Sequence, residues 1–184
     1  MRELVLENVY NFRECLHLAL EYFKISSASI SIMQENKIIL KSEEELPEKS
    51  AFLEKMKELA LSVEKKALEE KINQICNEKI LLGFDCDALG SLHHYDARIE
   101  DQINIQALVS ANLGSFFRCA EVLEDKSYSN KIYKEHTAEQ IRSVFNSALK
   151  FKSDLLAFYG KQKERLASIN SLEELEAFKI GELD

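Results

Sequence analysis

Apolar residues close to the N-terminus recur at every third or fourth position, which is the spacing of one helix face. Between Leu6 and Phe23 this face consists of Val9, Phe12, Leu16, Leu20 and Phe23. The spacing predicts an amphipathic helix over the segment.

The next segment, 26–42, changes to an alternation of apolar and polar residues. Ala28, Ile30 and Ile32 alternate with polar neighbours, and a second apolar run, 37–40, follows the polar triplet Gln34-Glu35-Asn36. Apolar, β-branched runs on both sides of a short polar turn are typical of a β-hairpin.

An acidic linker, 42–46, leads to Pro47, which suits the first turn of a helix because an N–H at that position would lack a helical partner anyway. Helical spacing then continues to about Leu82. The first half of this predicted helix carries a coiled-coil-like stripe, made of Leu53, Met56, Ala60, Val63 and Ala67.

Such a stripe cannot be buried by one helix alone. We expect it to pack on another helix of this chain or on a second copy of the chain. The candidate partner-binding residues are Leu53, Met56, Ala60 and Val63.

Gly83 marks a change of pattern. Two short strands are predicted on either side of a turn near Leu89-Gly90, the second of them ending at Tyr95. Asp96 is expected to cap a helix over 97–112, which Gly114 closes. The expected buried positions of this helix are Ile99, Ile103, Ala107 or Leu108, and Ala111.

Two further strands are predicted, over 116–123 and 131–134, with a polar turn between them. Thr137 and Gln140 then have the spacing of a capping box, in which each side chain bonds the backbone N–H of the other residue. A long helix follows, with an apolar seam of Ile141, Val144, Ala148, Phe151, Leu155 and Phe158. Ser171 and Glu174 repeat the box before a short last helix.

These elements define an α+β, helix-rich fold. It comprises an N-terminal helix and β-hairpin (1–46), a long central amphipathic helix (47–82), and a module of short hairpins packed on a long helix (83–184). The chain of 184 residues is 46% hydrophobic, with five glycines and one proline. Few turn residues and a substantial apolar content favour long helices and a real core.

The formal net charge is −8. Phosphate backbones repel an acidic protein, so nucleic acid is not an expected partner. The N-terminal sequence has no signal-peptide pattern, and no apolar run reaches the roughly 20 residues that span a bilayer. We therefore predict a cytoplasmic protein that does not bind membranes.

Candidate chemistry is sparse. The pair His93-His94, with Cys86 and Cys119, suggests a metal site, but neighbouring strand residues point to opposite faces. The expected arrangement is one half-buried and one exposed histidine. Cys119 with His136 suggests a nucleophile and its base, yet a strand cysteine is more often a small buried hydrophobe. We predict no catalytic residues, no cofactor, no metal and no small-molecule substrate.

The C-terminal half contains a set of short motifs in a fixed order: Gly83-Phe84, Ala88-Leu89-Gly90, Tyr95-Asp96, Asp101-Gln102-Ile103-Asn104, Phe117-Arg118-Cys119, His136-Thr137-Ala138-Glu139-Gln140 and Ser171-Leu172-Glu173-Glu174-Leu175. With these motifs, the C-terminal half resembles a module of small tailed-bacteriophage proteins that are often encoded beside tail-fibre genes. The resemblance covers about 79–178 and is absent from 1–46. The resemblance implies a tail-associated or tail-fibre-assembly role.

Several of these motif residues have a direct physical interpretation. Gln102 and Asn104 lie in the first turns of a predicted helix beside the hairpin that contains Tyr95. We expect them to bond hairpin backbone groups, with a partner-recognition surface as the alternative. The structural motif residues are Tyr95, Asp101, Gln102, Asn104, Thr137 and Gln140.

The expected function is therefore non-enzymatic. The chain is interpreted as a phage or prophage tail protein, either a structural subunit or a tail-fibre assembly factor. It would bind a tail or tail-fibre protein, or a second copy of itself, through the N-terminal segment and the 47–82 helix. The alternative is a small acidic regulatory or inhibitory protein that binds a host complex.

Overall fold

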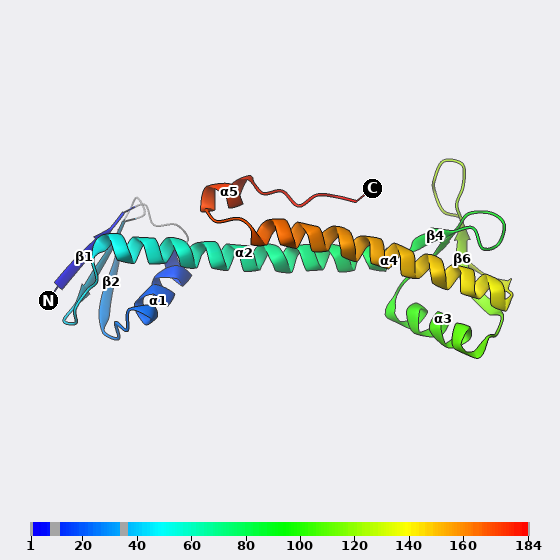
Figure 1. The fold of residues 1–184 in the computed structure, drawn as a ribbon, viewed down its shortest axis with the longest axis horizontal. Coiled ribbons are helices and arrows are strands. Elements are labelled where there is room, and N and C mark those ends of the chain that lie inside the picture. The colour runs from blue at the N-terminus through cyan, green and yellow to red at the C-terminus, as the bar shows by residue number, and fades with distance from the viewer. Residues whose placement is uncertain (1, 8–11, 34–36, 184) are drawn as a thin grey trace. The chain divides into compact units, whose positions relative to one another are not determined.

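The computed structural model describes residues 2–7, 12–33 and 37–183 (Figure 1). It is α+β and helix-rich, as predicted. Its contacts group into two compact units. Unit 1 comprises 1–69 and 165–179, and unit 2 comprises 70–164 and 180–184. The long helices α2 (Lys49–Leu81) and α4 (Ala138–Ala167) each contribute residues to both units.

Unit 1 contains a three-stranded antiparallel sheet in the order β1-β3-β2 and the helix α1 (Phe12–Tyr22). The strands β2 (Ala28–Met33) and β3 (Lys37–Ser42) confirm the predicted hairpin, whose expected turn at 34–36 lies outside the described residues. The strand β1 (Arg2–Leu6) was not predicted. Leu4 and Leu6 are both buried, and this period of two is a strand pattern too short to stand out.

The core of unit 1 lies between this sheet and the helices. Ile38 and Leu40 of β3 are buried together with Leu16 and Ala19 of α1 and with the first turns of α2. The α2 stripe belongs to this core: Met56 and Ala60 are buried, and Leu53 packs against them.

This burial bears on the predicted partner-binding role of the α2 stripe. The sequence marked Leu53, Met56, Ala60 and Val63 as a partner-binding face. The chain's own sheet and α1 cover Met56 and Ala60, while Leu53 and Val63 are half-buried. These four residues therefore do not form an exposed docking surface.

Two contacts complete unit 1 at its C-terminal end. Lys65 Nζ donates hydrogen bonds to the carbonyls of Ala167 (2.8 Å) and Ile169 (2.7 Å), where α4 has left backbone acceptors without helical partners. Ser171 caps α5 (Leu172–Ala177) by accepting from Glu174 N at 3.1 Å. The second half of the predicted box differs, because Glu174 accepts from Asn170 N rather than from Ser171 N.

Unit 2 is built on a four-stranded antiparallel sheet in the order β4-β5-β6-β7. Its strands are β4 (Phe84–Cys86), β5 (His93–Tyr95), β6 (Ser115–Glu121) and β7 (Ile132–His136). All four were predicted, and the ends of β6 and β7 differ from the predicted ends by one or two residues. The core of unit 2 contains Tyr95, Ile105, Phe117, Ile141 and Val144, which come from the sheet, α3 (Ile99–Ala111) and α4.

The start of α4 confirms the predicted capping box. Gln140 N donates to Thr137 Oγ1 at 3.2 Å, and Thr137 N donates to Gln140 Oε1 at 2.8 Å. The predicted seam also faces inward, since Ile141, Val144 and Leu155 are buried.

The buried face of α3 was predicted only in part. Ile99 and Ile103 are 66% and 60% exposed, and Ala107 and Ala111 are exposed as well. Ile105 is buried instead, and Leu108, one of the two alternatives at its position, packs against the same core. Both the Ile99-Ile103 set and the Ile105-Leu108 set fit a helical spacing, and the sequence alone does not say which set meets the sheet. The predicted cap was also wrong, because Asp96 pairs with Lys131 and Arg98 is the N-cap residue.

None of the described helices combines the length and the apolar character that crossing a bilayer requires.

Candidate binding groove

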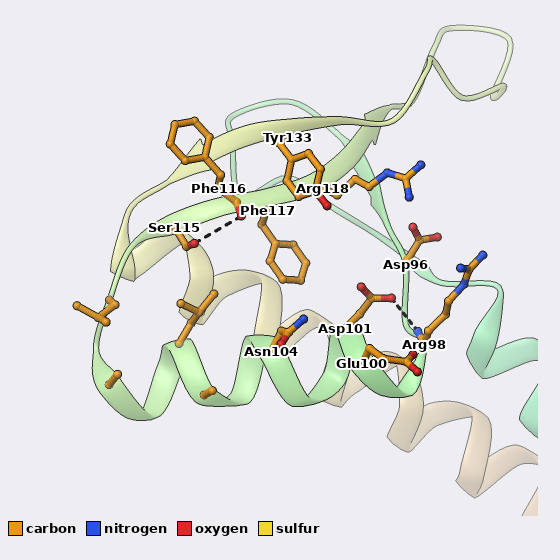
Figure 2. A pocket seen from close by; sticks show the side chains of 14 residues that line it. Asp96, Arg98, Glu100, Asp101, Asn104, Ser115, Phe116, Phe117, Arg118 and Tyr133 are labelled. Atoms are coloured by element: carbon orange, nitrogen blue, oxygen red, sulfur yellow. Dashed lines mark hydrogen bonds between the residues drawn. The ribbon is translucent and has the colours of Figure 1, made fainter.

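A groove of about 690 Å³ lies within unit 2, between α3 and the first half of β6 (Figure 2). One face of α3 forms one wall, and four consecutive β6 residues form the other. The lining residues are Asp96, Arg98, Glu100, Asp101, Asn104, Ala107, Leu108, Ala111, Leu113, Ser115, Phe116, Phe117, Arg118 and Tyr133.

A tight turn places these two walls beside each other. Asn112 ends α3 in the left-handed conformation, with φ 53°, and Leu113 N donates to Leu108 O at 3.1 Å. Gly114 then passes close to β7, since a Cβ there would lie 2.6 Å from His136 O. The predicted end of the helix near Asn112 is confirmed, but Asn112 rather than Gly114 is the residue that closes it. Gly114 instead allows the close backbone approach to β7.

Small side chains keep the groove open. Ala107 and Ala111 lie one turn apart on the groove face of α3, and both are exposed. Figure 2 shows Phe117 of β6 pointing toward α3, whereas Phe116 of β6 and Tyr133 of the neighbouring β7 lie on the other face of the sheet. Phe116 is 64% exposed and Tyr133 69% exposed. These rings offer apolar area that a partner would remove from water.

The opposite end of the groove is charged. Asp96 forms an ion pair and hydrogen bond with Lys131, and the arginines Arg98 and Arg118 flank it (Figure 2). Partial burial acts to raise the pKa of Asp96. The hydrogen bond and charge of Lys131, with the charges of Arg98 and Arg118, outweigh that effect and lower the pKa below its ordinary value.

Because Lys131 is the ion-pair partner of Asp96, Arg98 and Arg118 are available to bind a carboxylate of a partner. Lys131 already neutralises Asp96 at contact distance. Arg98 and Arg118 are exposed, and within the described part of the chain neither forms an ion pair at 4 Å or less. An incoming carboxylate can therefore bind them without displacing an existing ion pair.

The predicted motif residues of α3 divide between two roles. Asp101 and Asn104 line the groove, and Asp101 Oδ2 also accepts from Arg98 N at 3.2 Å. Gln102 lies on another face of α3. It donates to Ala97 O (2.7 Å) and accepts from Lys152 Nζ of α4 (2.9 Å). Gln102 thus links α3 to α4 and to Ala97, the residue before the N-cap Arg98. Contrary to the expectation, it does not bond the strands of the hairpin.

Tyr95 belongs to a buried polar network instead of the groove. Its hydroxyl lies 2.9 Å from His136 Nε2, and His136 Nδ1 lies 2.8 Å from Lys134 O. A carbonyl can only accept, so Nδ1 carries the proton and Nε2 accepts from Tyr95. Burial lowers the pKa of His136 and raises that of Tyr95, which favours the neutral form of both groups.

His93 and His94 are both buried, contrary to the expectation that one would be exposed. They do point to different neighbours. His93 contacts Ser91 O and Lys134 Nζ, each at 2.8 Å, whereas His94 contacts Asp85 Oδ1 (2.8 Å) and Leu82 O (3.0 Å). Among the described residues, no group of three or more His, Cys, Asp or Glu side chains could hold a metal ion.

Cys119 and His136 do not form an activated nucleophile and base. Cys119 is completely buried, and burial raises the pKa of its thiol, which disfavours the reactive thiolate. His136 Nε2 is already hydrogen-bonded to Tyr95. The geometry suits a packed, fully bonded core better than covalent chemistry.

The sequence did not mark Arg98, Phe116 or Tyr133 as site residues. One signal was present for Phe116. Adjacent residues of a strand face opposite sides, so Phe116-Phe117 in a predicted strand must expose one ring unless both faces are covered.

No family model matches this chain, and no curated protein or solved structure gives a significant match to it.

Proposed function

We propose that this protein is a non-catalytic binding protein that holds a segment of a partner protein in the groove between α3 and β6. The observation that carries the proposal is the groove itself. It combines exposed aromatic rings with two arginines that make no close ion pair among the described residues.

Binding explains this combination better than catalysis does. Tyr95, Cys119 and His136, whose pKa values are shifted chiefly by burial, are strand residues buried within unit 2. The groove carboxylate Asp96 is paired with Lys131 and is held in its charged form. General acid–base catalysis would instead favour a group whose pKa lies near the working pH.

The proposed partner is a bacteriophage tail or tail-fibre protein, and the proposed site of action is the cytoplasm of the infected cell during assembly. Three of the segments that carry the resemblance to the phage module supply groove residues. They contribute Asp96, then Asp101 and Asn104, and then Phe117 and Arg118. The resemblance and the groove thus involve the same part of the chain.

Co-expression tests this proposal. The full chain, carrying an affinity tag, is produced together with the tail and tail-fibre proteins of the same gene cluster. We expect one of them to co-purify in a fixed ratio. If none does, and a single host complex is retained instead, the regulatory alternative replaces the tail assignment.

A further inference from the structure

We infer that the groove binds its partner as an added β-strand, paired with the free edge of β6 and carrying an apolar and an acidic residue two positions apart. This inference rests on the proposed function, because it specifies how the same groove recognises a partner.

The sheet leaves room for such a strand. β7 pairs with β6 over Ser115–Cys119, whereas β5 pairs with β6 only over Cys119–Glu121. After Tyr95 the chain leaves the sheet to begin α3 at Ile99. On the β5 side, therefore, no described strand pairs with residues 115–118.

The direction of the backbone groups follows from neighbouring hydrogen bonds. Val122 N donates to Leu92 O at 3.0 Å, on the β5 side of the sheet. Glu121 O accepts from Ser129 N at 2.9 Å, on the opposite side. Because strand residues alternate, the N–H and C=O groups of Phe116 and Arg118 point to the β5 side, as those of Val122 do. That side is the groove.

The lining of the groove agrees with an edge site. Ser115, Phe116, Phe117 and Arg118 all line it, although successive side chains lie on opposite faces of the strand. A groove across one face would be lined by alternate residues only. The Phe116 carbonyl has one weak contact, from Ser115 Oγ at 3.5 Å, which an incoming N–H can replace (Figure 2).

The side chains specify the partner segment. Phe116 and Arg118 lie on the same face of β6, so residues two positions apart in an added strand lie opposite them. An apolar residue fits beside Phe116 and an Asp or Glu side chain beside Arg118, with Arg98 close to the same end. The residue between these two lies on the face toward α3, as Phe117 does in β6.

Peptide selection with the full chain provides the probe. A library of random displayed nonapeptides is panned against the immobilised protein, and the strongest binder is synthesised. We expect enrichment of an apolar and an acidic residue separated by one position. Enrichment of basic residues at that position, or no enrichment at all, would overturn the inference.

Two measurements on the selected peptide distinguish strand pairing from other modes. On binding, amide exchange at Phe116 and Arg118 should slow at least tenfold. The peptide amides are then N-methylated one at a time. Methylation at every second position should weaken binding at least tenfold, whereas methylation at the intervening positions should change the dissociation constant by no more than about twofold. Protection elsewhere, or a uniform response to N-methylation, would exclude an added strand.

Charge reversal tests the acidic position. Arg118→Glu should weaken binding of the selected peptide at least tenfold and shift a new selection toward basic residues. The control Lys57→Glu changes an exposed residue of unit 1 and should leave binding within about twofold. Equal effects of the two variants would contradict a local role for Arg118.

The outcomes separate this inference from the proposed function. If a tail protein co-purifies but no strand pairs with β6, only the inference of an added strand is contradicted. If a selected peptide pairs with β6 but no tail protein co-purifies, only the proposed partner is contradicted.

Discussion

Gly83 illustrates how one residue fixes the passage from α2 into the sheet of unit 2. It joins α2 to β4 with φ +96°, and an added Cβ would lie 2.2 Å from Tyr95 O. We predict that Gly83→Ala lowers the free energy of unfolding by at least about 1–3 kcal/mol, the usual cost of the strained dihedral alone. Urea unfolding measures the change.

Gly160 provides the matched control, since it lies inside α4 and nothing lies within 4 Å of an added Cβ. Gly160→Ala should raise stability by about 1 kcal/mol, because alanine loses less backbone entropy in a helix. If both alanine variants had the same effect, the close contact at Gly83 would not be the cause.

His136 should make stability depend on pH. Burial lowers its pKa from the ordinary 6.5 in the folded chain. Its contribution to stability is therefore complete above pH 6.5 and is lost as the pH falls from there through the lowered folded-state value. Urea unfolding between pH 7.5 and 5.0 should show this loss.

The imidazole proton resonances of His136 give an independent readout of the same prediction. In the folded protein, the titration midpoint of His136 should lie below 6.5, the ordinary value expected in the unfolded chain. A titration midpoint at or above 6.5 in the folded state would contradict the account.

Residues with local partners were predictable from the sequence, and residues with distant partners were not. Thr137 and Gln140 bond each other across three positions, so their spacing was enough. Asp96 was expected to cap the nearest helix but pairs with Lys131, 35 positions away. The burial of His94 similarly depends on Asp85 across the hairpin and on Leu82.

At the scale of elements, the N-terminal cap of α4 makes a measurable contribution. Thr137→Ala removes the hydroxyl that accepts from Gln140 N. We predict a loss of about 1 kcal/mol in the free energy of unfolding, the usual value for a helix N-cap. Thermal or urea unfolding of the variant tests this.

Ser153→Ala is the control for that variant, because Ser153 is exposed within the same helix. It should change stability by no more than about 0.5 kcal/mol. A Thr137→Ala effect as small as the control's would show that the capping box is energetically unimportant.

The elements themselves followed from periodicity, but the contacts between them did not. The seam of α4 was unambiguous because one set of apolar positions runs along it. Two sets compete on α3, and the turn at Asn112–Gly114 together with the bond of Gln102 to Lys152 orients the helix with Ile105 inward. The groove depends on that orientation, so its location was not predictable from spacing.

At the scale of the whole molecule, the sequence correctly indicated that the α2 stripe needs a covering surface. It did not reveal that β1, β3 and α1 supply that surface. Met56 and Ala60 are enclosed in unit 1, whereas the groove of unit 2 is open and is lined by exposed rings and arginines. The proposed binding role therefore moves from the central helix to α3 and β6.

The dissociation constant of the complex with the co-purifying protein tests most directly whether a partner segment occupies this groove. Ala107→Trp places a bulky ring in the groove, whereas Gln106→Trp alters the neighbouring exposed residue outside its lining. We predict at least a tenfold weaker complex for Ala107→Trp, about 1.4 kcal/mol, and a change within twofold for Gln106→Trp. Unchanged affinity in Ala107→Trp, or equal loss in both variants, would contradict binding in the groove.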